Sequence, residues 1–539
     1  MGGTIAGNRE DGSGGQPAHA GVGRHAFLVA AGIFLSRIAG LVRERVIAHF
    51  LGNTSIAADA LRGSLRIPNI LQNLFGEGVL SASFIPVYAR LLAQKEEEES
   101  GRVAGAILSL LVFVVAVLVL AGVLATPWII DVIVPGFKGE TRALTIRLVR
   151  ILFPGVGLLV MSAWCLGILN SHRRFFLSYV SAVVWNGAII GALLLFRRAG
   201  TTQLAVYAAW GSVVGSGLQV ALQLPVVLAL APKLRLAFAI ANENVRTVVR
   251  NFVPVFFSRG VNQVSGYVDQ LLASYLPMGA VSALSVAQAL YMLPVSLFGM
   301  SISAAELPAM SSALGSESEV AETLRQRIAA STKRIGFFVV PSAVGFIALG
   351  DVITAAIYQT GRFSHADSVY VWSILAGSGV GLVASTIGRL YSSAYYSLRD
   401  TRTPLRFATV RVILTTALGY FCALPLPKLL GIDPRWGVAG LTASAGFAGW
   451  VEFLLLRSGM NRRIGRSEFP ASVFVRLWLA AVIAAAAAWA IKWGLHPQRP
   501  LIAAVLILVP YGAVYLGCTE LFGVEQAKSL VRRVLRPKS

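Results

Sequence analysis

The sequence predicts an all-α polytopic membrane protein with about 14 transmembrane helices. Of its 539 residues, 56% are hydrophobic and only 13% are charged, whereas about a quarter are charged in soluble domains. The mean hydropathy is +0.70. The apolar residues form continuous runs of about 20 residues or more, the length of a helix that crosses a bilayer. A transmembrane β-barrel would show short segments of alternating polarity, so that class is excluded.

Each expected span is an apolar run between two polar breaks, taken in chain order. The fourteen runs cover residues 26–49, 56–90, 103–134, 143–169, 175–196, 203–231, 248–276, 279–312, 328–358, 367–397, 404–430, 436–457, 473–494 and 501–522.

The segment before the first span reads as a disordered cytoplasmic tail. It is rich in Gly and polar residues and lacks the basic-then-apolar order of a cleaved signal peptide. The three cysteines lie far apart inside apolar runs, so neither a disulfide framework nor a metal site is expected. The predicted organisation is a tail (1–25), an N-lobe of spans 1–6 (26–232), a C-lobe of spans 7–12 (246–460), spans 13 and 14 (470–523) and a basic cytoplasmic tail (524–539).

Lys and Arg alternate between successive loops. One side, which includes both termini, carries 27 of them and the other side carries ten. The positive-inside rule therefore predicts that both termini are cytoplasmic. The net charge of +22 is scattered over short inter-helix clusters, so it indicates membrane orientation and not a nucleic-acid surface.

The chain resembles itself at a separation of about 222 residues. FLSR at 34–37 parallels FFSR at 256–259, and LFGEGVLSASFIP at 74–86 parallels LFGMSISAAELP at 297–308. Six spans separate the copies, so the halves have the same topology and form parallel repeats related by an axis along the membrane normal. Two such lobes are typical of an alternating-access transporter. Spans 13 and 14 lie outside the repeat, and their Ala-rich run at 480–489 offers a small-residue packing surface.

Charged residues inside the first two spans are the strongest functional signal. An ionised side chain in a bilayer core costs a few kcal/mol, so it must face a partner, a wet cavity or a charged ligand. On span 2, helical spacing places Asp59, Arg62 and Arg66 on one stripe with two asparagines. Pro68 is expected to bend this helix. Span 1 carries Ser36, Arg37, Arg43, Glu44 and Arg45.

The second half repeats this pattern more weakly. Arg259 and Asp269 share a stripe on span 7, Ser385 and Arg389 share one on span 10, and Arg411 stands alone on span 11. Arginine outnumbers carboxylate across the spans, so an anionic ligand is expected in the cavity. Arginine is also the side chain best suited to bidentate capture of phosphate oxygens.

A structural interpretation stays open for several of these charges. Arg43, Glu44 and Asp59 can pair across the first two spans to hold the bundle together, because intramembrane charges often pair with one another. Arg45 can extend to the outer interface, and Arg411 can pair with Asp269. For Arg37 and Arg43 the ligand interpretation is favoured, whereas for Glu44, Asp59 and Glu77 the two interpretations have equal weight.

Several segments together resemble the MurJ/MviN family. They are SRIAGLVRERVIAHFLG (36–52), ADAL (58–61), RIPNILQNLFGEGVLSASFIPVYA (66–89), GILNSHRRF (167–175) and YYSLRDTRTP (395–404). The resemblance implies the fold of the multidrug/oligosaccharidyl-lipid/polysaccharide exporter superfamily. It also implies flipping of lipid II, the undecaprenyl-diphosphate-linked peptidoglycan precursor, across the bacterial cytoplasmic membrane for cell-wall synthesis. A diphosphate ligand agrees with the arginine excess.

The resemblance also assigns individual residues. Ser36, Arg37 and Arg43 match the family's serine and arginines of span 1, Glu44 stands where an acid is usual, and Asp59 and Glu77 match the acids of span 2. Asp269 matches the acid of a sodium site, although span 11 offers no second acid. The expected substrate-binding residues are Ser36, Arg37, Arg43, Arg62, Arg66, Arg259 and Arg389; the expected gating or ion-pair residues are Glu44, Asp59 and Glu77.

Two positions depart from the family pattern, since Gln72 and Ala289 replace usual arginines. Arg62, Arg66, Arg259 and Arg389 are the candidates for replacement charge. The departures leave open a flippase for another polyprenyl-diphosphate-linked glycan, and a non-transporting scaffold with a transporter-like fold is a further alternative.

No nucleotide-binding GxxxxGK[ST] segment occurs, so transport must draw on the membrane potential, a Na⁺ or H⁺ gradient or substrate flux. No cofactor or metal is expected, and no catalytic set of residues indicates an enzyme. The expected partners are the lipid-linked glycan, membrane lipids and cell-wall synthesis proteins, and the chain is expected to be a monomer.

Overall fold

The computed structural model describes residues 18–312, 316–467, 469–495 and 499–528, and gives only the backbone for 18–31, 33, 77, 175, 179 and 257–265. Within these residues every regular element is helical, which confirms the all-α prediction. The helices are α1 (Ala18–Leu51), α2 (Ile56–Arg66), α3 (Asn69–Phe75), α4 (Glu77–Ser83), α5 (Ile85–Ala93), α6 (Glu97–Ile133), α7 (Gly139–Ser171), α8 (Phe175–Leu195), α9 (Thr201–Leu230), α10 (Glu243–Ser274), α11 (Ala280–Pro294), η1 (Val295–Met300), α12 (Ser301–Ser311), α13 (Glu317–Tyr358), α14 (His365–Ser397), α15 (Arg402–Ala423), α16 (Pro425–Leu430), η2 (Pro434–Trp436), α17 (Gly437–Ile464), α18 (Ala471–Leu495) and α19 (Pro500–Leu521).

Twelve helical segments of the described residues are long and apolar enough to cross a membrane. They correspond to twelve of the fourteen expected spans. The other two expected spans, 26–49 and 248–276, fall on α1 and α10, two long helices that include residues without described side chains.

The second expected span is interrupted three times. The predicted bend at Pro68 is confirmed, because α2 ends at Arg66 and Pro68 is the N-cap of α3. Two further breaks, at Gly76 and at Phe84, were not predicted. At Gly76 an added Cβ would collide with the backbone carbonyl oxygen of Gln72, so this turn requires glycine.

The repeated LFG segment marks irregular backbone in both halves of the chain. In the first half Gly76 separates α3 from α4. In the second half Gly299 lies within η1, a π-helical turn between α11 and α12. Single π-helical turns are rare and occur often at functional sites. The internal repeat therefore extends from sequence to local backbone geometry.

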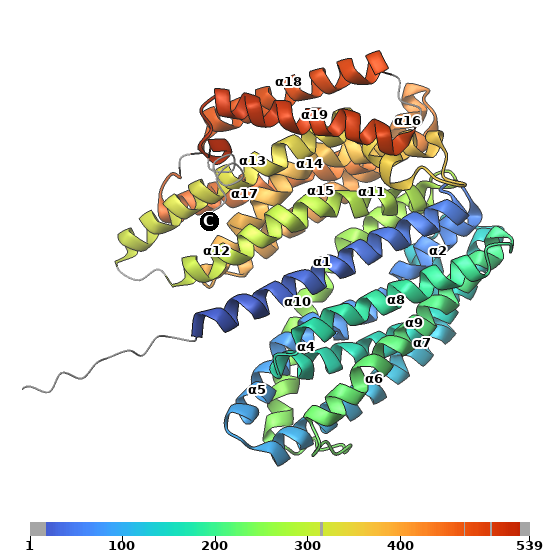
Figure 1. Cartoon of the computed structure of the whole chain (residues 1–539), viewed down its shortest axis with the longest axis vertical. Helices are drawn as coiled ribbons and strands as arrows, with labels where there is room; N and C mark the ends of the chain where they lie inside the picture. Colours follow the sequence, from blue (N-terminus) through green and yellow to red (C-terminus); the bar gives the residue numbers. More distant parts are fainter. Residues whose placement is uncertain (1–17, 313–315, 468, 496–498, 529–539) are drawn as a thin grey trace, which may run out of the picture.

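The helices pack in two groups, which Figure 1 shows in blue to green and in yellow to red. In the first group α7 packs on α9 and on α2, and α8 packs on α9 and α1. In the second, α14 packs between α13 and α17, and α15 packs on α17. Helix α10 contacts α4 and α6 as well as α11 and α15, so it touches both groups. The exact lobe boundaries stay a prediction.

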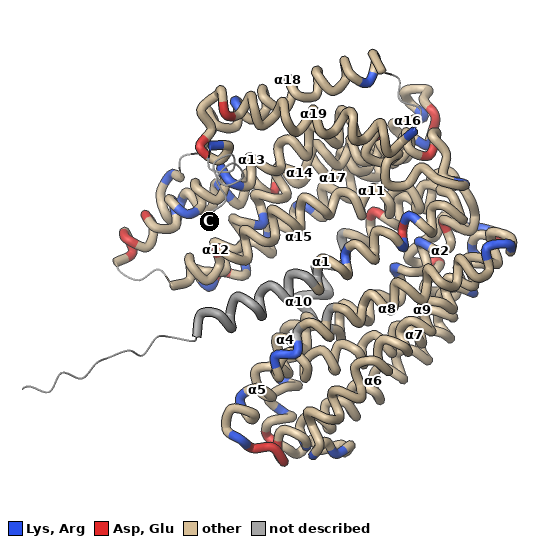
Figure 2. The backbone as a smooth tube through the Cα atoms, viewed as in Figure 1, with Lys and Arg blue, Asp and Glu red and all other residues tan. Residues whose placement is uncertain are grey.

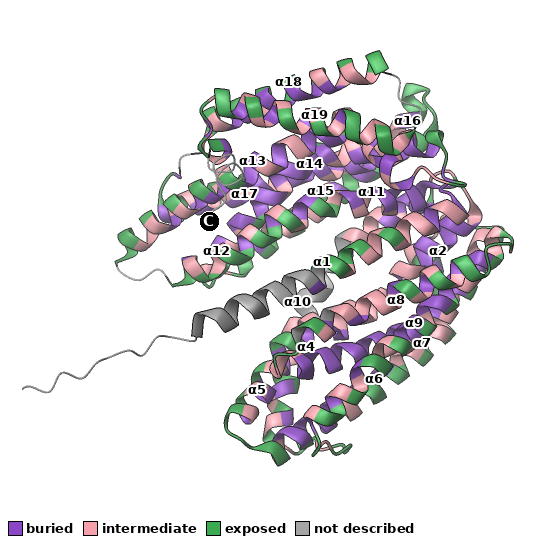
Figure 3. Cartoon of the chain, viewed as in Figure 1, coloured by how far each residue is buried: buried purple, intermediate pink, exposed green. Residues whose placement is uncertain are grey.

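The last two helices cover α13. The hydroxyl groups of Tyr511 and Tyr515 donate to backbone carbonyls of α13, each over 2.7 Å. The predicted packing role of the Ala-rich run is confirmed by its buried alanines, among them Ala480, Ala484 and Ala488. Figure 3 shows buried residues concentrated where the helices of each group face one another.

Candidate functional site

The two groups of helices meet at the end of the molecule where α1 ends and α2 begins, which we call the joined end. Away from it the two groups diverge (Figure 1). Figure 2 shows charged residues gathered on α1 and α2 near this end as well as at other helix ends.

At the joined end, Asp59 of α2 caps the N-terminus of α11. Its carboxylate accepts hydrogen bonds from the backbone N–H groups of Gly279, over 2.6 Å, and of Ser282, over 2.8 Å. Gly279 is the N-cap residue of α11 and has φ of 93°, a conformation that favours glycine. A carboxylate at a helix N-terminus satisfies unpaired donors and interacts favourably with the helix dipole. Asp59 is only 3% exposed, so this contact is shielded from water.

Arg62, one turn further along α2, is also buried and reaches the same residues. Its guanidinium donates to the hydroxyl of Ser282 and lies 3.8 Å from the Glu44 carboxylate. The Ser282 hydroxyl in turn donates to the side-chain oxygen of Asn53 over 2.8 Å. We name the set Asn53, Asp59, Arg62, Gly279 and Ser282 the α2–α11 lock. It joins the two repeats through buried polar contacts.

Arg43 and Glu44 extend the lock toward α8. They form an ion pair of 2.7 Å, and the Arg43 guanidinium lies 4.8 Å from the centre of the Trp185 ring. Of the two alternatives left open by the sequence, the structure shows pairing for Glu44, which lies between two arginines. Arg43 retains a partly exposed guanidinium, with 17% of its side chain accessible. Asp59 pairs with α11 and not with span 1.

Arg66 contacts the second half at a position that the repeat relates to its own. Its guanidinium donates to the Gln288 side chain over 3.1 Å, and the two residues are 222 positions apart. It also faces the Tyr267 ring, and the Tyr267 hydroxyl donates to the Arg66 carbonyl over 3.0 Å. Arg66 and Gln288 therefore meet where the two repeats face each other.

A second inter-repeat contact joins α1 to the end of α13. The Arg45 guanidinium donates to the carbonyls of Ala356 and Ile357, over 2.8 and 2.7 Å, in the last turn of α13. One turn later His49 pairs with the Thr360 hydroxyl over 2.9 Å. A cation at the C-terminus of a helix satisfies its free carbonyls. Arg45 thus binds the end of another helix; its expected extension to the outer interface stays a prediction.

The expected partner of Arg411 is wrong. Arg411 of α15 pairs with Glu452 of α17 over 3.0 Å, and not with Asp269. One carboxylate oxygen of Asp269 is buried without a hydrogen-bond partner, and the fields of Arg66 and Arg411 act on this carboxylate. The sequence alone did not show that α17 turns Glu452 toward α15.

The remaining predicted site residues do not belong to the α2–α11 lock. Ser36 and Arg37 lie on α1 away from the lock, with Arg37 exposed. Arg389 is exposed on α14, one turn after Ser385, which pairs with the Tyr291 hydroxyl over 2.6 Å. The side chains of Glu77 and Arg259 lie outside the described residues. Their roles stay predictions.

The segment YYSLRDTRTP has a structural role. Asp400, between α14 and α15, accepts hydrogen bonds from the backbone and hydroxyl of Thr403 and pairs with Arg463 over 2.6 Å. Partial burial raises the pKa of the Asp400 carboxyl, but the bonds from Thr403 and the Arg463 charge outweigh it and lower the pKa below its usual value. Asp400 therefore holds the loop between α14 and α15 against α17.

Several residues of the joined end were missed by sequence reasoning, namely Asn53, Gly279, Ser282, Gln288 and Tyr291. The repeat offset would have paired Arg66 with Gln288, but polar uncharged residues give little signal by themselves. Among the described residues, no group of three or more His, Cys, Asp or Glu side chains could hold a metal ion.

Comparisons with known proteins agree with this architecture. A family model described as Lipid II flippase MurJ matches residues 47–508. The Lipid II flippase MurJ of Burkholderia cenocepacia is 30% identical over 523 residues, which cover 93% of this chain and 98% of that protein.

Two solved structures share the fold. One, titled Lipid II flippase MurJ, inward closed conformation, is 24% identical, with a TM-score of 0.76, and covers 94% of this chain and 100% of that one. The other is an inward-facing multidrug resistance MATE family transporter of the MOP superfamily, 17% identical, with a TM-score of 0.64, and it covers 81% of this chain and 98% of that one. The family match spans most of the chain, and the protein therefore belongs to the MurJ family of lipid II flippases.

Proposed function

We propose that this protein flips lipid II from the inner to the outer leaflet of the bacterial cytoplasmic membrane by alternating access, with both termini in the cytoplasm. The observation that carries the proposal is the family match over residues 47–508. The family is one of transporters, so the protein is proposed to bind its substrate on one side of the membrane and release it on the other without a chemical reaction.

The contacts at the joined end support alternating access. In the proposed orientation α1 runs from the cytoplasm outward, so the α2–α11 lock lies at the outer end. A lock of buried hydrogen bonds there would hold the lobes together while substrate enters from the cytoplasm. These contacts join separate helices and not one continuous core, so they can open without unfolding either lobe.

Arg37 and Arg43 are the proposed diphosphate-binding residues. Both lie on α1 before the lock, and Arg43 is already held by Glu44 and Trp185 in a defined position. An arginine binds phosphate oxygens through charge-assisted hydrogen bonds that contribute about 1.5–3 kcal/mol each. A diphosphate would compete with Glu44 for Arg43 and so weaken the link from Arg43 through Glu44 to Arg62.

Energy is proposed to come from the membrane potential or from a Na⁺ or H⁺ gradient. Asp269 is the candidate coupling residue, because it carries a buried carboxylate oxygen without a hydrogen-bond partner between two arginines. Its neighbours are cationic, which disfavours a bound Na⁺ and favours a role in charge balance.

A second candidate substrate is another polyprenyl-diphosphate-linked glycan. Two observations favour this candidate. Gln72 and Ala289 replace the family's arginines, and Gln288, beside Ala289, accepts a hydrogen bond from Arg66. The cations available to the ligand therefore differ from the family pattern.

Rescue of bacteria depleted of their own lipid II flippase tests the proposal. We expect this protein to restore growth, and the purified protein to bind lipid II about tenfold more tightly than undecaprenyl-diphosphate carrying other sugars, a difference of about 1.4 kcal/mol. Failure to rescue, together with flipping of another lipid-linked sugar in vesicles, would establish the second candidate. Failure of both would favour the scaffold alternative.

A further inference from the structure

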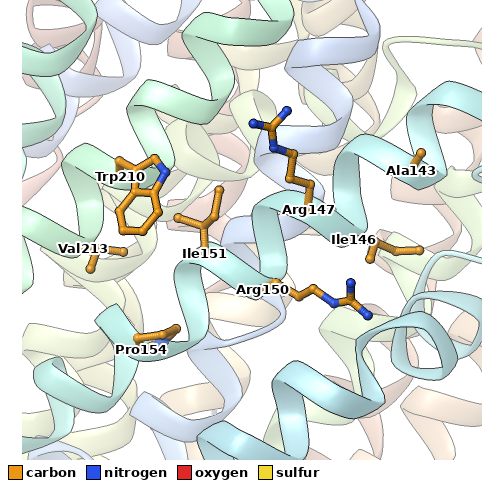
Figure 4. A pocket seen from close by; sticks show the side chains of 8 residues that line it. All are labelled: Ala143, Ile146, Arg147, Arg150, Ile151, Pro154, Trp210 and Val213. Atoms are coloured by element: carbon orange, nitrogen blue, oxygen red, sulfur yellow. The ribbon is translucent and has the colours of Figure 1, made fainter.

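A groove with two arginines lies on the outer surface of the first helix group, between α7 and α9 (Figure 4). It has a volume of about 520 Å³. Residues from α7 and α9 line it: Ala143, Ile146, Arg147, Arg150, Ile151, Pro154, Trp210 and Val213. None of them belongs to the α2–α11 lock.

The depth of the groove in the membrane follows from the sequence of α7. After Arg150 the helix continues with 21 uncharged residues, 151–171, which extend about 32 Å at 1.5 Å per residue. This length is just enough to cross the hydrocarbon core of a bilayer, which is about 30 Å thick. Arg150 therefore lies at the edge of the hydrocarbon core and Arg147 about one turn further out, near the depth of the lipid phosphates.

The two arginines have no acidic partner among the residues that the structure describes. Both are exposed, and with the described residues they form one weak hydrogen bond, of 3.3 Å from Arg150 to the Val123 carbonyl. Asp131, an acid near the end of α6, is already bound by two guanidinium nitrogens of Arg142, over 2.7 and 2.9 Å. Two cations at a membrane surface thus remain available to an anion from the surroundings.

The rest of the groove fits the apolar part of a lipid. Trp210 is 52% exposed on α9, and Val214 beside it is 55% exposed. Tryptophan at this depth is typical of residues that contact the headgroup region. Ile151 and Pro154 continue the groove along α7 toward the hydrocarbon core (Figure 4). An occupant with an anionic head and an apolar chain matches both parts, whereas a free phosphate matches only the first.

We infer that this groove binds the phosphate headgroup of an anionic phospholipid, with an acyl chain along Ile151, Pro154 and Val213. The site is separate from the proposed diphosphate residues Arg37 and Arg43. In the proposed orientation it faces the outer leaflet, because α7 begins at the joined end. The inference does not depend on which glycan the protein transports.

Native mass spectrometry of the purified full chain tests the site, with equimolar palmitoyl-oleoyl phosphatidylglycerol and phosphatidylcholine as probes. We expect phosphatidylglycerol adducts to exceed phosphatidylcholine adducts, and the double variant Arg147→Gln/Arg150→Gln to lose at least about tenfold in phosphatidylglycerol affinity. Arg435→Gln is the matched control, since Arg435 is an exposed arginine elsewhere that already lies 4.0 Å from Asp433. It should bind as the original protein does.

Trp210 provides a local readout that does not depend on folding of the double variant. Phosphatidylglycerol with brominated acyl chains should quench the fluorescence of the original protein more than that of Trp210→Phe. Inorganic phosphate should not displace the bound lipid. Equal adducts of the two lipids, unchanged affinity in the double variant, or displacement by phosphate alone would overturn the inference.

Discussion

Replacement of Asp59 by alanine is expected to shift the protein strongly toward a state in which the joined end is open. The substitution removes two hydrogen bonds from a buried carboxylate to the N-terminus of α11 and leaves Arg62 without a nearby acid on its own helix. Each such charge-assisted bond contributes about 1.5–3 kcal/mol, so the joined state should lose about 3 kcal/mol or more, which corresponds to a population change of about 100-fold.

Spin labels across the joined end measure this shift. Arg198→Cys and Arg362→Cys place labels on exposed positions of the two helix groups, in a chain whose three native cysteines are replaced by alanine. Asp59→Ala should populate longer distances between the labels. Asp131→Ala is the matched control, because it removes an exposed acid that contacts only Arg142 within one group. Identical distance distributions in Asp59→Ala and the original protein would contradict the role of the lock.

Replacement of Arg43 by glutamate is expected to abolish growth support in flippase-depleted bacteria. The change reverses the charge of a proposed diphosphate-binding residue and places a second carboxylate beside Glu44, whose remaining contact is Arg62 at 3.8 Å. Loss of one charge-assisted phosphate contact alone costs about 1.5–3 kcal/mol, or about tenfold to 100-fold in affinity, and like-charge repulsion adds to it.

Plating efficiency at equal protein level checks this result. Arg43→Lys keeps the charge but loses the bidentate geometry, so it should retain partial support. Arg198→Glu is a second control, because Arg198 is an exposed arginine outside the proposed site, and it should leave growth unchanged. Full growth with Arg43→Glu would show that Arg43 has only a structural role.

Helical spacing was sufficient to predict the stripe of Asp59, Arg62 and Arg66. All three side chains do face one neighbour, α11, as a shared stripe requires. Their partners could not be predicted. Gly279 and Ser282 act through backbone N–H groups, which almost every residue has, and through the hydroxyl of a common residue type. Which donors lie opposite a stripe depends on how the two repeats approach each other.

Backbone irregularities were predicted only where a single residue forces them. Pro68 lacks an N–H group, so a break there follows from its chemistry. The breaks at Gly76 and Phe84 and the π-helical turn η1 depend on packing between helices. The repeat carried useful information at this point, since Gly76 and Gly299 are equivalent positions.

The position of Gln288 next to Ala289 can be interpreted only with the structure. The sequence marks a missing cation near positions 288 and 289. In the structure the Gln288 side chain accepts a hydrogen bond from Arg66, so the cation at this meeting point of the repeats comes from the first half.

We propose that the joined end must open for lipid II to cross the membrane. Linking His49→Cys to Thr360→Cys with a short cleavable cross-linker, and measuring lipid II translocation in proteoliposomes, tests this opening. These side chains are within hydrogen-bond distance in this structure, at 2.9 Å, but belong to different helix groups. The control links Asp131→Cys to Arg142→Cys within one group. We expect translocation to fall to the rate of protein-free vesicles when positions 49 and 360 are linked and to recover after cleavage, while the control is unaffected. Translocation by the linked protein at the unlinked rate would contradict the proposal.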